Sequence, residues 1–82
     1  MRLDKYLKVS RIIKRRTVAN EACDAGRVVV NGKIARASYD VKANDVIELT
    51  LGARTVKARV VSVNEYAKKD EAAMMYEIIE EK

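Results

Sequence analysis

The feature that most constrains the fold of this chain is the Asn-Gly pair at positions 31–32, which separates two short apolar runs. Val-Val-Val occupies residues 28–30 before the pair, and Lys-Ile-Ala occupies residues 33–35 after it. A two-residue β-hairpin turn needs positive φ at both central residues, and Asn and Gly adopt it more readily than other residues do. The sequence therefore predicts an antiparallel pair of strands over residues 28–35.

The residues before this hairpin have helical spacing. Leu3, Tyr6 and Leu7 recur three and four positions apart, which predicts a short helix over residues 2–9 with lysine amines in solvent. A second helix is expected over residues 18–25. It would thus precede the hairpin directly.

The ends and the apolar face of this second helix also have sequence signals. We expect Thr17 to be its N-cap and Gly26 to end it in the left-handed conformation. Ala19, Ala22 and Cys23 share one face, and a free cysteine in such a place usually behaves as a small buried hydrophobe. We therefore predict a core position for Cys23.

The residues after the hairpin alternate as strands do. A turn at residues 44–45 is followed by a strand over 46–51, and residues 55–63 alternate as a further strand. Residues 70–75 suit a helical turn or two, while residues 76–79 are compatible with either helix or strand. These elements predict an α+β fold in which two N-terminal helices pack on a small mixed or antiparallel sheet.

Composition restricts the function of the 82-residue chain, which we treat as a single domain over residues 1–82. It has no His and one Cys, so it lacks an imidazole base, an internal disulfide and the ligands of a tetrahedral zinc site. Its N-terminus has no secretory apolar run, and no segment approaches the ~20 apolar residues that span a bilayer. We expect a soluble, cytoplasmic binding module without enzymatic activity, cofactor, metal, membrane or small-molecule substrate.

Charge is distributed unevenly along the chain. Residues 1–36 contain ten basic and three acidic side chains, a net charge of +7, whereas residues 37–82 contain seven basic and nine acidic ones, a net charge of −2. Such asymmetry is typical of proteins that bind nucleic acid or an anionic membrane surface, and less often it only keeps a helical surface solvated. A polyanion would contact the first half.

Three spaced motifs resemble the S4 RNA-binding domain family. They are RLDKYL at residues 2–7, RRTVANEACDAGRVVVNGK at 15–33 and VKANDVIEL at 41–49. The chain departs from the family pattern at Arg15, where Ser is usual, and at Asn44, where Gly is usual. Asn tolerates the left-handed backbone that Gly would adopt there, so neither departure threatens the fold.

This resemblance implies the S4 (αL-type) fold, with the RNA-binding motif over residues 1–52 and a strand plus a short C-terminal extension over 53–82. The chain is most similar to the short, free-standing bacterial members that act in ribosome quality control. Such a monomer would bind large-subunit rRNA and peptidyl-tRNA on obstructed subunits, beside RqcH, during alanine tailing. The alternatives are a heat-shock-type S4 protein that recognises blocked large subunits, and a basic adaptor for an acidic protein.

The residues expected to contact RNA combine the basic first half with the family motifs. Arg16 matches the recognition arginine of the family, and the other cations would bind phosphate without sequence choice. Asp4 is either a first-turn carboxylate, a positioning partner of Arg16 or an acceptor for RNA; Arg2 would reach phosphate from a flexible N-terminus. The full set is Arg2, Asp4, Lys5, Lys8, Arg11, Lys14, Arg15, Arg16, Thr17, Asn31 and Lys33.

The four tyrosines, Tyr6, Tyr39, Tyr66 and Tyr76, are scattered along the chain. They do not form the pattern of an aromatic stacking platform of the kind that RRM domains use. This scatter favours recognition of structured RNA by its backbone and shape.

Overall fold

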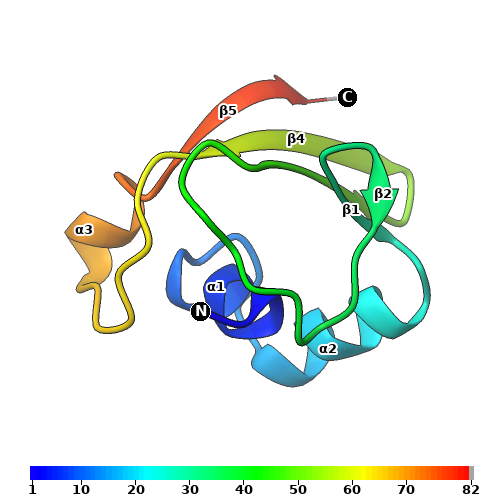
Figure 1. The fold of residues 1–82 in the computed structure, drawn as a ribbon, viewed down its shortest axis with the longest axis horizontal. Helices are drawn as coiled ribbons and strands as arrows, with labels where there is room; N and C mark the ends of the chain where they lie inside the picture. The colour runs from blue at the N-terminus through cyan, green and yellow to red at the C-terminus, as the bar shows by residue number, and fades with distance from the viewer. Residues whose placement is uncertain (82) are drawn as a thin grey trace.

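A computed structural model describes residues 1–81 of the chain and has the expected α+β architecture. Helices α1 and α2 lie together against one face of a five-stranded antiparallel sheet of order β2-β1-β3-β4-β5 (Figure 1). The short α3 lies to one side, beside α1. In chain order the elements are α1 (Leu3–Val9), α2 (Arg16–Asp24), β1 (Val28–Val30), β2 (Lys33–Ile34), β3 (Val46–Leu51), β4 (Arg54–Val60), α3 (Lys69–Ala72) and β5 (Tyr76–Glu81).

The Asn-Gly hairpin forms as predicted. Asn31 has φ 53° and Gly32 has φ 83°, so both turn residues adopt the positive φ that a two-residue turn requires. Val30 pairs directly with Lys33 across the turn. Strand β2 is shorter than expected and ends at Ile34; the next residue, Ala35, is buried, and its amide still donates to the carbonyl of Val28 at 3.0 Å.

The predicted N-cap at Thr17 is wrong. Helix α2 begins at Arg16, and the capping position is Arg15, whose extended backbone makes no side-chain cap bond. The buried Ile13 anchors the chain just before this point, and Arg16 contacts Asp4 of α1 from the first turn. Tertiary contacts therefore set the start of this helix in place of a capping hydroxyl.

The core lies between the two helices and the inner face of the sheet. Tyr6 and Leu7 of α1 are fully buried, and the Tyr6 hydroxyl donates to the carbonyl of Met75 at 2.8 Å. Cys23 lies in this core as predicted, and burial raises the pKa of its thiol to about 11. Truncating such a side chain, for example Leu7→Ala, costs about 2–5 kcal/mol in globular proteins.

The C-terminal segment resolves the choice left open for residues 76–79, since β5 is a strand. Ala58 pairs with Ile78 and Lys57 with Glu80, so a bulge leaves Ile79 as the extra residue. The bulge breaks the alternation that periodicity detects. Strand β4 ends at Val60, earlier than predicted, because the next two amides both donate to the carbonyl of Met75.

Within the described residues 1–81, no helix has both the length and the apolar character needed to cross a bilayer. The two N-terminal helices instead use their apolar residues to cover the sheet. Of the ten cations of residues 1–36, Lys5, Lys8 and Arg16 lie on these helices, and Arg11, Lys14 and Arg15 lie in the loop between them.

Candidate nucleic-acid interface

A buried carboxylate organises the surface formed by the first turns of α1 and α2. The Asp4 side chain is only 3% exposed, yet it accepts a hydrogen bond from Arg2 Nε at 3.2 Å and from Arg16 Nε at 3.4 Å. Asn20 Nδ2 donates to it at 3.2 Å, and the amide of Lys5 donates at 2.8 Å. The two guanidinium side chains remain 52% and 48% exposed, so the carboxylate faces inward and the cations face solvent.

Asp4 is ionised at neutral pH. Burial acts to raise its pKa, but the hydrogen bonds from Asn20, Arg16 and the Lys5 amide outweigh burial, and the pKa lies below its usual value. An arginine has five N–H donors in a planar fork that matches phosphate or carboxylate. Because Asp4 engages only part of each fork, Arg2 and Arg16 retain donors for an anion outside the protein.

Arg2 does not extend from a flexible N-terminus, so that expectation is wrong. Arg2 and Asp40 form a β-bridge, and the amides of Leu3 and Asp4 donate to the carbonyls of Tyr39 and Ala37. Together with the bond from the Val41 amide to the carbonyl of Met1, these bonds fix the backbone on both sides of Arg2. Its guanidinium is therefore held next to that of Arg16 through their shared partner Asp4.

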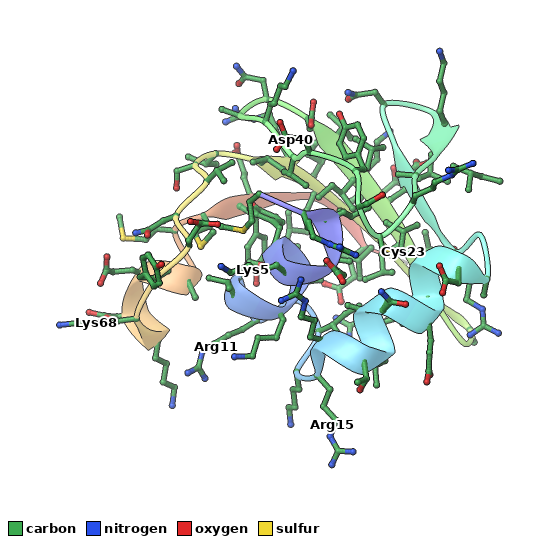
Figure 2. The ribbon with its side chains drawn as sticks, turned by 60° about the horizontal axis from the view of Figure 1, so that its bottom comes forward. Lys5, Arg11, Arg15, Cys23, Asp40 and Lys68 are labelled. Atoms are coloured by element: carbon green, nitrogen blue, oxygen red, sulfur yellow. The ribbon has the colours of Figure 1, made fainter. Side chains whose placement is uncertain are left out.

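The loop between α1 and α2 presents further cations. Arg11, Lys14 and Arg15 are exposed, and Figure 2 shows Arg11 and Arg15 pointing away from the body of the protein. Arg11 has φ 65°, a left-handed backbone that is unfavourable for a residue with a Cβ atom. The strain is held by buried Ile13, whose amide donates to the carbonyl of Leu7 at 3.0 Å.

One lysine of the C-terminal half also lies on this side of the molecule. Lys68 lies on the same side of the molecule as Lys5 and Arg11, beyond Lys5 in the view of Figure 2. It was not among the predicted contacts, although the Lys-Lys pair at 68–69 was a possible signal. Helix α3 itself contains Lys69, Asp70 and Glu71, so this end of the chain adds the Lys68 cation without adding net positive charge.

Asn20 is a second residue that sequence reasoning missed. It lies one turn after Arg16 on α2 and donates to Asp4. Lys8 and Thr17 are exposed on the same two helices, as expected for contact residues. Spacing alone could have placed Asn20 on the face of Arg16, because residues four apart are neighbours on a helix.

Asn31 and Lys33 lie apart from the Asp4 cluster, in the β1–β2 hairpin. The Asn31 side chain is engaged within the protein, since its Nδ2 donates to Asp45 at 3.0 Å and its Oδ1 accepts from the amide of Val46 at 2.9 Å. Asp45 also accepts from the Tyr39 hydroxyl at 2.8 Å. This network fixes the hairpin, and it gives Asn31 a structural role whether or not RNA contacts it.

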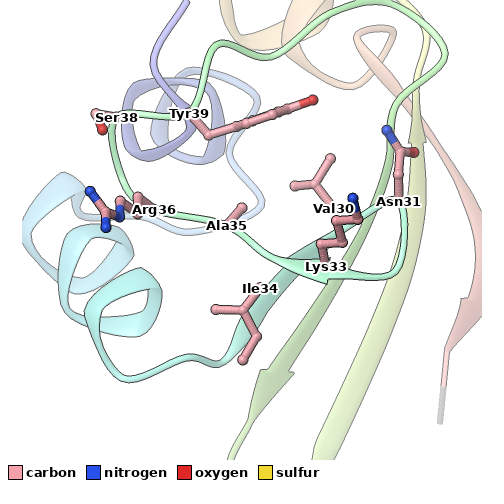
Figure 3. Close-up of a pocket in the computed structure, with 8 residues that line it drawn as sticks. All are labelled: Val30, Asn31, Lys33, Ile34, Ala35, Arg36, Ser38 and Tyr39. Carbon is pink, nitrogen blue, oxygen red and sulfur yellow. The ribbon is translucent and has the colours of Figure 1, made fainter.

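Lys33 is exposed beside a shallow groove of about 560 Å³ along the edge of the sheet. Figure 3 shows Lys33 and Ile34 on β2 and Arg36 on the segment that follows. No carboxylate of the described residues lines the groove, and Tyr39 in its lining accepts a backbone hydrogen bond from Leu3, the residue before Asp4. Within residues 1–81, no group of three His, Cys, Asp or Glu side chains is placed to hold a metal ion.

Comparison with known proteins agrees with the motifs. The model of the S4 domain family matches residues 1–47. The chain is 56% identical to the RQC P-site tRNA stabilizing factor of Streptococcus pneumoniae over 99% of its length and 92% of the relative's. It is 51% identical to the factor of the same name in Bacillus subtilis, over 99% and 94% of the two chains.

The fold also matches a solved structure. Trimeric Heat Shock Protein 15 of Vibrio cholerae superimposes with a TM-score of 0.87 at 28% identity, over 95% of this chain and 80% of that one. The arrangement of two helices on an antiparallel sheet is therefore shared with that protein.

Proposed function

Because the chain belongs to the S4 domain family, we propose that it is a non-catalytic RNA-binding factor of bacterial ribosome quality control. It acts in the cytoplasm on obstructed large ribosomal subunits. There it binds rRNA and the peptidyl-tRNA and keeps this tRNA in the P site while RqcH directs the addition of alanine residues. It binds as a monomer.

One observation carries this proposal, namely the pair of half-exposed guanidinium groups that Asp4 holds at the start of α1 and α2. Bidentate guanidinium contacts suit phosphate, and the neighbouring loop adds cations that strengthen binding without sequence choice. The relatives with 47–56% identity over nearly the whole chain bear the name of a P-site tRNA stabilizing factor, which supports tRNA as one ligand.

The test is co-sedimentation with purified large subunits that carry peptidyl-tRNA. Arg16→Ala is expected to weaken binding by ~1–3 kcal/mol with the fold unchanged. Arg54→Ala is the matched control, because it removes the same charge from an exposed side chain of β4, which belongs to the sheet layer. Equal binding of wild type and Arg16→Ala would reject the assignment.

A salt titration separates RNA binding from the adaptor alternative. Binding to RNA releases counterions, and the slope of log K against log salt rises with the number of neutralised phosphates. We expect a steep slope for subunit binding, and a slope one unit shallower for a variant that lacks one phosphate contact.

The heat-shock-type protein remains the second candidate, and the shared fold favours it. Heat Shock Protein 15 extends beyond the region that this chain covers, and its identity to this chain is half that of the stabilizing factor. The two candidates differ in the process that they serve. Alanine tailing that weakens when the factor is omitted supports the quality-control factor, whereas unchanged tailing on obstructed subunits supports the alternative.

A further inference from the structure

Tyr66 has an exposed ring at the edge of the basic surface. The Tyr6 and Tyr39 hydroxyls are bonded to Met75 and Asp45, and Tyr76 is half-buried in β5, whereas Tyr66 is 85% exposed. A single exposed apolar side chain is ordinary on a protein surface. Exposure alone therefore does not indicate a binding role for Tyr66, and the groups around the ring decide it.

The ring is held against α1. Lys5 Nζ lies 5.6 Å from the centre of the Tyr66 ring and 3.4 Å from Oε1 of Glu65. The backbone amide of Tyr66 donates to Asn64 Oδ1 at 3.0 Å, which fixes the turn that carries the ring. Figure 1 shows the segment between β4 and α3 descending beside α1. One face of the ring is thus near a cation, and the high exposure leaves the rest of the ring accessible.

A cleft of about 440 Å³ is bounded by the chain segment that carries this ring, although Tyr66 itself is not among its lining residues. It lies between the α1–α2 loop and the segment that carries Tyr66, and Glu65 and Ala67, the two chain neighbours of Tyr66, form one of its walls. Its lining residues are Lys8, Val9, Arg11, Lys14, Glu65 and Ala67. Three cations therefore line a cleft bounded by the segment that carries the exposed ring, and its one carboxylate is already paired with Lys5.

This combination matches the two parts of a nucleotide. A base stacks on an aromatic face, and its phosphate is bound by lysine or arginine, which is how proteins hold single-stranded RNA without reading its sequence. We propose that Tyr66 stacks one unpaired base of RNA while Lys8, Arg11 and Lys14 bind the adjoining phosphates. The inference rests on the proposed RNA-binding function. It adds the binding of an unpaired nucleotide to a surface otherwise suited to recognising RNA by its backbone and shape.

The experiment compares Tyr66→Leu and Tyr66→Phe with wild type on two probes, an eight-nucleotide single-stranded RNA of adenosines with 2-aminopurine near its centre, and an RNA duplex of eight base pairs. Leucine keeps an apolar side chain without the ring face, and phenylalanine keeps the ring without the hydroxyl. Met74→Leu is the control, because Met74 is exposed to a similar degree outside the cleft.

We expect Tyr66→Leu to bind the single strand about 5- to 100-fold more weakly and to lose the quenching of 2-aminopurine, while Tyr66→Phe and Met74→Leu bind as wild type does. Affinity for the duplex should be equal in all four proteins, because paired bases offer no free face. Unchanged binding of the single strand by Tyr66→Leu overturns the proposal. An equal loss in Tyr66→Phe also overturns it, because phenylalanine keeps the ring and should still stack. An equal loss on the duplex overturns it as well, because paired bases offer no face to the ring.

The two proposals fail separately. If Arg16→Ala weakens subunit binding while Tyr66→Leu binds the single strand normally, the base contact is rejected and the RNA-binding function stands. If Tyr66→Leu fails on the single strand while Arg16→Ala leaves subunit binding unchanged, the base contact stands and the assigned recognition residue is rejected.

Discussion

Two buried aspartates, Asp4 and Asp45, are satisfied by different kinds of donor. Asp4 accepts from the guanidinium groups of Arg2 and Arg16, which are half exposed. Within residues 1–81, the hydrogen bonds to Asp45 come from neutral groups, namely the Asn31 side-chain amide, the Tyr39 hydroxyl and the Lys42 backbone amide. In both residues burial acts to raise the pKa, and the hydrogen bonds outweigh it and lower the pKa.

The difference separates a structural carboxylate from a positioning one. The donors to Asp45 are parts of the hairpin and of the segment before β3, so its bonds join pieces of the fold. The charged donors to Asp4 remain in contact with solvent and keep donors for a ligand. We therefore infer that Asp45 acts mainly on stability and Asp4 mainly on binding.

The largest expected effect is on stability, at Asp45. Asp45→Ala leaves the Tyr39 hydroxyl and the Asn31 amide without their acceptor, which should lower the free energy of unfolding by ~1–3 kcal/mol. Asp4→Ala should cost less stability, because exposed guanidinium groups regain water. Urea denaturation measures both variants. A larger loss in Asp4→Ala than in Asp45→Ala would contradict the comparison.

The next effect is a loss of stability in acid. A carboxyl whose folded pKa is lowered stabilises the protein above its unfolded pKa, and that contribution disappears as pH falls through the folded value. For Asp4 and Asp45 the free energy of unfolding should therefore decrease below pH ~4, the usual aspartate value. Urea unfolding at pH 7 and pH 3 measures the decrease. It should be smaller in the Asp4→Asn/Asp45→Asn double variant; an equal decrease would show that other groups cause it.

A smaller pair of opposite effects is expected at Arg11. Arg11→Gly removes the strain of a left-handed arginine, which is worth ~1–2 kcal/mol for a residue with a Cβ atom, so stability should rise by part of that amount. Affinity for large subunits should fall, and the salt slope should become shallower by about one unit. Arg11→Lys is the control, because it keeps both charge and strain. Unchanged affinity in Arg11→Gly would remove this loop from the interface.

Much of the fold could be predicted because its signals are local. The hairpin depends on two adjacent residues, Asn31 and Gly32, and the two N-terminal helices show their apolar faces within seven to nine residues. Residues 76–79 remained undecided because the bulge at Ile79 interrupts strand alternation. The start of α2 was misplaced because contacts with Asp4 set it.

The site was only partly predictable, because some of its contacts join residues that are far apart in the sequence. The basic residues and the pairing of Asp4 with Arg16 were expected, and the structure brings these two side chains together. Asn20 and Arg2 join them through packing that no local pattern specifies. Tyr66 lies beside Lys5 although sixty residues separate them in sequence, and their contact depends on how the chain crosses from β4 to α3.

The most direct test of the positioning role of Asp4 is a double-mutant cycle with Asp4→Asn and Arg16→Ala, read as affinity for large subunits. Removing a negative charge near RNA would tighten binding if Asp4 merely repelled phosphate. Our account predicts that Asp4→Asn weakens binding, and does so much less once Arg16 is Ala, with a coupling energy of ~0.5–3 kcal/mol. Additive losses, or tighter binding of Asp4→Asn, would contradict the account.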